Sequence, residues 1–240
     1  MSDLSRVTAV ILAGGKGLRL RKVVSDRPKV MAQINGKPFI AYLLDQLVAA
    51  GIGRVIISTG YMADILEDTF GTRYNDLHVD YSREVTPLGT AGALKLAGQT
   101  VATKYCLVMN GDSYTEFDPV SLFRFHKQKN ANILLLVRLA SSTSRFGIIQ
   151  MNEQNEIVRF VEKGDSKGPG FINAGVYIMK TSAFEKIPDK KPYSLEYDFF
   201  PSMIGKSIYS YETAGNFIDI GTPKSYAQAE VFFKQLTVNI

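Results

Sequence analysis

Residues 7–17 read VTAVILAGGKG, an apolar run that ends in three glycines, Gly14, Gly15 and Gly17. A short apolar run bounded by turn residues is typical of a strand that is buried on both faces. Glycines directly after such a strand let backbone N–H groups approach phosphate oxygens without a Cβ in the way. The stretch therefore predicts a buried strand followed by a phosphate-binding turn.

The chain around this stretch alternates between strand and helix patterns. Further strands are predicted at 54–58, 105–110 and 133–139. Helical spacing is found between Pro38 and the stop at Gly51, over residues 61–70, and from a cap at Asp118 to residue 125. Alternation of this kind implies parallel crossovers, so residues 1–140 predict a Rossmann-like, doubly wound α/β fold with a mostly parallel sheet. Ligands of such sheets bind beyond the carboxyl ends of the strands.

The second half of the chain has a different pattern. Short strands are predicted at 148–150, 157–162, 173–179 and 207–211, with turn-rich stretches between them, which indicates a mixed or antiparallel extension. A final helix is expected to begin near Thr222 and Pro223. Because no Pro- or Ser-rich linker and no repeat separates the halves, residues 1–240 are interpreted as one domain with two parts, 1–140 and 141–240.

The composition excludes several classes of protein. Of the 240 residues, 45% are hydrophobic and 21% charged, which predicts a folded core. No run approaches the roughly 18 apolar residues of a membrane span, so the chain is expected to be a cytoplasmic protein that does not bind membranes. A single cysteine, Cys106, cannot form an internal disulfide, and two histidines, His78 and His126, cannot by themselves complete a structural zinc site.

Basic residues gather directly after the glycines. Residues 16–29 contain six Lys or Arg residues and a single acid, Asp26, within a chain of net charge +5. A solvated basic loop is one interpretation. The position of this cluster after a glycine-rich strand end favours a compact phosphate pocket over an extended nucleic-acid groove, so no nucleic-acid partner is expected.

The glycine motif is neither GxGxxG nor a GxxxxGK[ST] phosphate loop, which disfavours dinucleotide and ATPase readings. The pattern Gly-Gly-x-Gly-x-Arg followed by Pro-Lys resembles the signature of the sugar-1-phosphate nucleotidyltransferases, which release pyrophosphate as they join a nucleoside triphosphate to a sugar 1-phosphate. Further blocks continue the resemblance in order: PLGTAGA (87–93), NGD (110–112), RFG (145–147), EKG (162–164), NAG (173–175) and FIDIGTP (217–223).

The resemblance assigns roles to the opening motif and implies the nucleotide-diphospho-sugar transferase fold, with residues 1–140 binding the nucleotide and 141–240 the sugar. Arg19 matches the arginine that stabilises pyrophosphate, and Lys29 matches the lysine that reaches the reacting phosphates. Leu18 departs from the usual threonine, and this change removes one hydroxyl contact but no backbone donor. The residues expected to bind the nucleotide phosphates are Leu12, Ala13, Gly14, Gly15, Gly17 and, in the NGD block, Gly111.

Two aspartates lie in apolar surroundings far apart in the sequence. Asp112 follows the run at 105–110, and Asp219 lies within FIDI. A buried carboxylate is unfavourable unless it is paired or metal-bound, although each aspartate alone could be a turn or cap acceptor. Together they resemble the family's magnesium pair, and Mg²⁺ is suited to one or two carboxylates plus substrate phosphates.

The proposed chemistry requires no protein nucleophile. No Ser/His/Asp or Cys/His arrangement can be assembled from this sequence. A sugar 1-phosphate, with a second pKa near about 6, is largely ionised at neutral pH and can attack the α-phosphorus directly. Catalysis then consists of holding two polyanions in line and neutralising their charge, through Arg19, Lys29 and magnesium, with Asp112 in the catalytic set.

Base recognition is expected in residues 84–93, EVTPLGTAGA. Glu84 can accept two hydrogen bonds together from N1 and N2 of guanine, whereas uracil and thymine offer one N–H between two carbonyls. Gly89 and Gly92 would let a base edge meet the backbone, and Pro87 and Thr90 belong to the same block. GTP is therefore the favoured nucleotide, with Glu84 as a solvated turn residue being the alternative.

The resemblance places the sugar 1-phosphate in the second half. Glu162 and Lys163 match a Glu-Lys pair that meets the sugar hydroxyls and the 1-phosphate, although Gly164 stands where proline often follows and a surface salt bridge is the alternative. The remaining residues expected to contact the sugar are Gly147, Asn173 and Glu196.

Within the family, the blocks most resemble the D-glycero-α-D-manno-heptose-1-phosphate guanylyltransferases of bacterial surface-glycan synthesis. A mannose-1-phosphate guanylyltransferase and a uridylyl- or thymidylyl-transferring relative are the alternatives, because no residue in the sequence indicates how many carbon atoms the sugar has. A non-catalytic sensor and a nicotinamide-dependent oxidoreductase are alternatives from other classes, and retention of Arg19, Lys29 and both aspartates disfavours the sensor. The sequence also leaves a homo-oligomer open.

Overall fold

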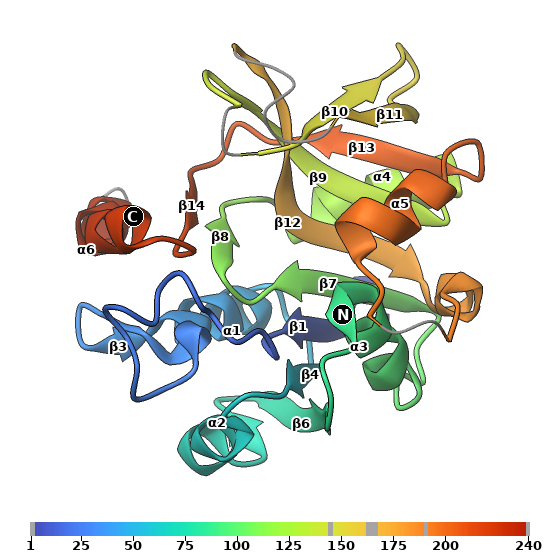
Figure 1. Ribbon diagram of the computed structural model, residues 1–240. Helices are drawn as coiled ribbons and strands as arrows, with labels where there is room; N and C mark the ends of the chain where they lie inside the picture. The colour runs from blue at the N-terminus through green and yellow to red at the C-terminus, as the bar shows by residue number, and fades with distance from the viewer. Residues whose placement is uncertain (1–2, 144–145, 162–167, 190–191, 239–240) are drawn as a thin grey trace.

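The protein is described by a computed structural model that covers residues 3–143, 146–161, 168–189 and 192–238. In this part of the chain, one large sheet has the strand order β11-β10-β12-β7-β1-β4-β6-β5, and β9 pairs with both β12 and β13. Figure 1 shows the sheet running through the whole molecule. Its strands are β1 (Val7–Leu12), β4 (Arg54–Thr59), β5 (Arg73–Tyr74), β6 (Leu77–Arg83), β7 (Tyr105–Asn110), β9 (Ile133–Ala140), β10 (Ile148–Met151), β11 (Ile157–Val161), β12 (Gly170–Lys180) and β13 (Ile208–Glu212).

The pairing confirms the predicted α/β fold. β1 pairs in parallel with β4 and β7, and β4 pairs in parallel with β6. β12 then runs antiparallel to β7, β9 and β10, while β13 is parallel to β9. The first part therefore supplies a parallel sheet and the second a mixed extension. Because β12 hydrogen-bonds directly to β7, the two parts share one sheet.

Helices cover both faces of this sheet, which explains why its central strands, such as β1 and β7, are almost entirely apolar. In β1, Ile11 packs into the core beneath α1, α2, α4 and α6, whereas Val10 faces the core that contains α3 and α5. This alternation follows from the two-residue repeat of a strand. The helices are α1 (Phe39–Ala49), α2 (Ala63–Phe70), α3 (Gly89–Gly98), α4 (Pro119–Lys129), α5 (Phe200–Ser202) and α6 (Pro223–Val238).

Short elements shape the carboxyl edge of the sheet. One ribbon pairs β2 (Gln33–Ile34) with β3 (Lys37–Pro38), and another pairs β8 (Ser113–Thr115) with β14 (Phe217–Asp219). The second ribbon connects the two halves of the chain, since β8 follows β7 directly and β14 precedes α6. Short 3₁₀ turns occur at Asp3–Arg6, Lys29–Met31 and Thr181–Lys186, and a π-helical turn at Leu195–Phe199 precedes α5.

Local signals predicted most elements within a few residues. Asp118 caps α4 by accepting a 2.9 Å hydrogen bond from the Val120 N–H, as expected, but the helix continues to Lys129 rather than ending at residue 125. The strand β6 and the helix α3 were not predicted. Cys106 lies buried in β7, where burial raises the pKa of its thiol. Among the described residues, no helix combines the length and apolar character needed to cross a membrane.

Candidate active site

A cavity of about 680 Å³ opens where the parallel strands β1, β4 and β6 end. This position agrees with the rule that ligands of such sheets bind at the carboxyl ends of the strands. Most of the residues predicted to bind the nucleotide line it. These are Leu12, Ala13, Gly14, Gly15, Glu84, Pro87, Gly89 and Thr90. The cavity is also lined by Lys29 and Asp112 of the predicted catalytic set, and by Glu196, which was predicted to bind the sugar.

The glycine turn after β1 forms one wall of this cavity. The Ala13 N–H donates to the Ser58 carbonyl at 2.8 Å, which ties the turn to β4. At Gly15 an added Cβ would meet no atom within 4 Å, so its backbone borders open space. Gly17 has φ +59°, and its carbonyl accepts from the N–H groups of Leu20 and Arg21. Gly17 therefore supplies the left-handed residue that turns the chain back.

Glu84 is half-buried directly after β6 and accepts a hydrogen bond within the turn that follows. Its Oε2 accepts a 3.0 Å hydrogen bond from the Leu88 N–H, and a Cβ on Gly14 or Gly60 would lie 2.7 or 2.8 Å from its Oε1. Burial raises the pKa of the Glu84 carboxyl, and the Leu88 hydrogen bond opposes that shift. Glu84 thus borders the first cavity while organising the turn that leads to α3.

A second cavity, also of about 680 Å³, lies over β12 and the strands of the extension. It contains Gly147 and Asn173, two of the residues predicted to bind the sugar. Glu162 and Lys163 lie outside the described residues. The remaining predicted residues that line this cavity are Arg19, Asp112, Glu196 and Asp219.

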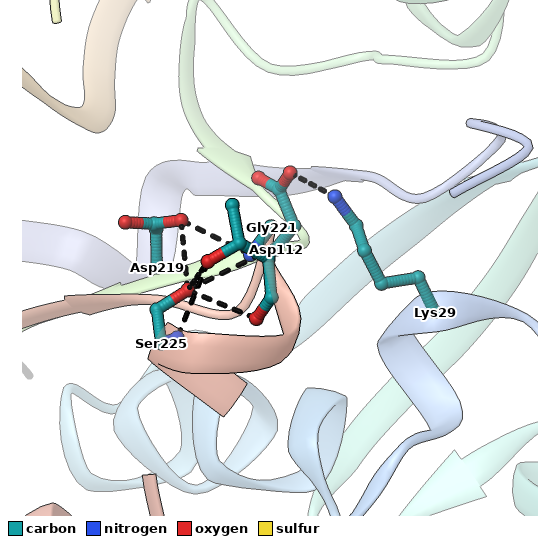
Figure 2. A network of polar contacts seen from close by, with 6 residues as sticks. Lys29, Asp112, Asp219, Gly221 and Ser225 are labelled. Carbon is teal, nitrogen blue, oxygen red and sulfur yellow. Dashed lines mark hydrogen bonds and ion pairs between the residues drawn. The ribbon is translucent and has the colours of Figure 1, made fainter. Parts of the chain in front are cut away.

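Three residues line both cavities: Asn110, Asp112 and Glu196. At this junction the Lys29 ammonium forms an ion pair with Asp112 Oδ2, seen in Figure 2. Lys29 comes from the 3₁₀ turn after the basic loop, whereas Asp112 follows β7. A positively charged group from the first part thus lies where the two cavities meet.

The β8–β14 ribbon brings Asp219 next to Asp112. Asp219 pairs in register with Ser113, and the Ile220 N–H donates to the Asp112 carbonyl at 2.9 Å. Asp219 Oδ1 accepts from the Gly221 N–H at 3.0 Å and from the Ser225 hydroxyl at 3.4 Å (Figure 2). Both aspartates therefore border the second cavity, although 107 residues separate them in the sequence.

The Arg19 guanidinium and the Asp219 carboxylate both lie near Gly221. A Cβ on Gly221 would lie 3.0 Å from Asp219 Oδ1 and 3.5 Å from Arg19 Nη2, so Gly221 leaves room for both side chains. Arg19 lines the second cavity and not the first. Gly17 and Gly111, which were predicted to bind the nucleotide, line neither cavity. Their backbone groups are instead bonded within the protein, Gly17 to Leu20 and Arg21 and Gly111 to Leu12.

Sequence reasoning missed several polar groups at this edge. In the described part of the chain, five buried side-chain oxygens have no hydrogen-bond partner, and four of them lie at this edge: Ser58 Oγ, Thr59 Oγ1, Asn110 Oδ1 and Ser113 Oγ. Buried polar atoms are normally hydrogen-bonded, so such a cluster at the strand ends is typical of a ligand site. For Asn110 a signal existed, because it opens the NGD block. Tyr61 was also missed, and the Arg21 guanidinium lies 4.8 Å from the centre of its ring.

The sequence is similar to those of known guanylyltransferases. The chain is 37% identical over 223 residues to the D-glycero-alpha-D-manno-heptose 1-phosphate guanylyltransferase of Aneurinibacillus thermoaerophilus, which covers 92% of this chain and 96% of that protein. It is 33% identical to the mannose-1-phosphate guanylyltransferase of Mycobacterium tuberculosis over 93% of this chain, but it spans only 63% of that protein.

Solved structures share the fold. The crystal structure of HddC from Yersinia pseudotuberculosis superposes with a TM-score of 0.85 at 35% identity, over 95% of this chain and 99% of that one. The same protein complexed with GMP-PN superposes with a TM-score of 0.83 at 34% identity, over the same shares of the two chains. The nucleotidyl transferase family profile matches residues 8–235, nearly the whole chain. The chain therefore belongs to the nucleotidyl transferase family and is a nucleotidyltransferase.

Proposed function

We propose that this protein transfers a guanylyl group from GTP to a sugar 1-phosphate and releases pyrophosphate. The observation that carries the proposal is the pair of cavities that meet at Asn110, Asp112 and Glu196. One cavity is bordered by a glycine turn suited to phosphates, and the other by polar residues of the extension. Two substrates bound in them would have their reacting ends at the shared wall.

The reaction requires that the sugar 1-phosphate and the triphosphate of GTP, both negatively charged, approach each other. An oxygen of the sugar 1-phosphate forms a bond to the α-phosphorus, and the bond from that phosphorus to the bridging oxygen of pyrophosphate breaks. Lys29 lies at the junction and would offset charge on the transferring group, while N–H groups of the glycine turn would hold the departing phosphates. Arg19, on the other side of Asp112, would offset charge from the second cavity.

The acidic pair fits a magnesium ion. Among the described residues no group of three or more His, Cys, Asp or Glu is arranged as a metal cage. Asp219 ends β14, Asp112 directly precedes its partner strand β8, and both border one cavity. Mg²⁺ is usually held by one or two carboxylates, with waters and substrate phosphates completing its coordination. When bound by this pair, the ion would supply positive charge to the reacting phosphates.

For the sugar, we propose D-glycero-α-D-manno-heptose 1-phosphate. Support comes from the relative of that name, which matches this chain over nearly its whole length at 37% identity. Mannose 1-phosphate is the second candidate, because relatives that carry that name are 32–33% identical. For the nucleotide, support comes from the guanylyltransferase names, from the GMP-PN complex of HddC, and from the Glu84 carboxylate at the edge of the first cavity.

Pyrophosphate release tests these assignments. The purified protein with Mg²⁺ is given GTP, ATP, UTP or dTTP together with heptose 1-phosphate, mannose 1-phosphate or glucose 1-phosphate. We expect GTP with heptose 1-phosphate to give the highest kcat/KM. A preference for mannose 1-phosphate would correct the sugar assignment, and a preference for UTP or dTTP would correct the base. Absence of turnover with every pair would refute the proposed function.

A further inference from the structure

The loop that leads into α3 is joined to the segment that carries Glu196. The Tyr193 N–H donates to the Leu88 carbonyl at 2.9 Å, and the Tyr193 carbonyl accepts from the N–H groups of Ala91 at 2.9 Å and Gly92 at 3.3 Å. Gly89 permits this approach, because a Cβ there would lie 2.5 Å from the Tyr193 carbonyl oxygen. The Gly92 N–H, which the sequence suggested for contact with a base edge, is thus bonded to Tyr193.

One side chain extends this junction to Glu196. The Thr90 hydroxyl accepts a 2.7 Å hydrogen bond from the Leu195 N–H and donates a 2.9 Å hydrogen bond to Glu196 Oε2. The Ser194 hydroxyl also donates to Oε2, at 3.1 Å. Hydrogen bonds to a carboxylate are stronger than those between neutral groups. Two hydroxyls therefore hold one oxygen of Glu196, and neither of these bonds engages Oε1.

The Glu196 carboxylate that these hydroxyls hold lies at the wall between the two cavities. Glu196 lines both cavities, together with Asn110 and Asp112. It lies in the first turn of the π-helical segment Leu195–Phe199, which Ser194 caps by accepting from the N–H groups of Glu196 and Tyr197. Thr90 and Glu196 are 106 positions apart in the sequence. The hydrogen bond from the Thr90 hydroxyl to Glu196 Oε2 joins the two side chains directly.

We propose that Thr90 is a positioning residue for Glu196 and sets the geometry of the sugar 1-phosphate site from the nucleotide loop. This inference rests on the proposed function and deepens it. The Thr90 hydroxyl keeps the Glu196 carboxylate at the shared wall, where it accepts from a hydroxyl of the sugar. Thr90 also lines the first cavity, but its hydroxyl is bonded to Leu195 and Glu196. We therefore expect its removal to weaken binding of the sugar 1-phosphate and to leave nucleotide affinity nearly unchanged.

A double-mutant cycle tests this coupling. The variants are Thr90→Val, which keeps the shape but removes the hydroxyl, Thr90→Ser, which keeps the hydroxyl, Glu196→Ala, and the double variant Thr90→Val/Glu196→Ala. Each is assayed with the nucleotide and sugar 1-phosphate that the wild-type protein turns over fastest, so the substrate assignment can fail without affecting the cycle. KM and kcat are measured for both substrates, and nucleotide affinity is measured separately by titration calorimetry.

We expect Thr90→Val to raise KM for the sugar 1-phosphate on the order of tenfold, as for loss of a hydrogen bond to a charged group. Nucleotide affinity should change by less than about twofold, the limit for an uncoupled site. Thr90→Ser should resemble the wild type, and Thr90→Val should add no loss when Glu196 is already Ala.

Three results would overturn the inference: losses that multiply in the double variant, a weaker nucleotide affinity with an unchanged sugar KM, or a Thr90→Ser variant as impaired as Thr90→Val. If Thr90→Val does not fold, Thr90→Ala removes the same hydroxyl with a smaller side chain and is carried through the same cycle with the same expectations. A wild-type protein without turnover for any substrate pair would refute both the proposed function and this inference, whereas multiplying losses in an active protein would refute the inference alone.

Discussion

Lys29 and Asp112 form an ion pair that bridges the two cavities, with 15% and 39% of their side chains exposed. Ion pairs with this degree of solvent contact contribute little to folding stability. The ion pair should matter more for catalysis than for stability, because the ammonium and the carboxylate both lie where the phosphates of the two substrates would meet. Substitution of Asp112 should therefore change turnover much more than it changes the free energy of unfolding.

Asp112→Asn tests that expectation. The amide keeps the size of the side chain but removes the negative charge that would help to bind Mg²⁺. We expect kcat for pyrophosphate release to fall on the order of a hundredfold or more, with a loss in unfolding free energy of only about 1 kcal/mol from the broken ion pair with Lys29. Asp68→Asn, on the exposed face of α2, is the matched control. Full activity of Asp112→Asn in saturating Mg²⁺ would remove Asp112 from the catalytic set.

The helix α3 shows how a glycine can serve packing between elements. Gly89 has φ +74°, and a Cβ there would meet the Tyr193 backbone at 2.5 Å. Gly205 has the same φ, +74°, but an added Cβ would meet no atom within 4 Å. The two glycines thus share one positive φ but differ in what surrounds the missing Cβ.

Alanine at each position separates these two effects. Gly205→Ala should destabilise the protein by about 1 kcal/mol, from the unfavourable backbone conformation alone. Gly89→Ala adds a steric conflict with backbone atoms that cannot rotate away, so we expect roughly 1–3 kcal/mol of further destabilisation. Urea unfolding of both variants measures the difference. Equal losses would mean that segment 193–196 can move off α3 without a penalty.

His126 gives the whole molecule a pH-dependent stability. Its side chain is buried on α4 against the Tyr105 and Phe123 rings, and burial, with a smaller contribution from the charge of Lys180, lowers its pKa to about 4. A histidine in an unfolded chain has a pKa of about 6.5. Between these two values the unfolded chain binds a proton that the folded chain does not bind.

Stability should therefore fall as the pH is lowered from about 6.5 to about 4, by roughly 3 kcal/mol through this group, and this contribution should level off below that range. His126→Phe removes the group, so the difference in unfolding free energy between wild type and variant should change across this window and be constant above it. His78→Gln, at the exposed histidine, is the control. A difference that stays constant from pH 7 to pH 4 would contradict the burial-based shift.

Local sequence patterns were sufficient for most strands and helices, because apolar periodicity and turn residues act over a few neighbouring positions. The run at 105–110 predicted β7, and the stop at Gly51 followed the end of α1. By contrast, α3 begins at Gly89 inside a block interpreted as a base-binding loop. Its first N–H groups are satisfied by the carbonyl of Tyr193, a partner about 100 residues away that no local pattern reveals.

The sequence by itself determined the fold class, the glycine turn, and the residue types that could bind phosphate or a metal ion, since these depend on composition and short-range spacing. Only the tertiary structure decided which of them meet. The β8–β14 register brings Asp219 to Asp112, Arg19 borders the second cavity, and the Thr90 hydroxyl bonds Glu196. Such contacts arise from strand order and from the packing of distant segments, and the separation of residues along the chain carries no information about them.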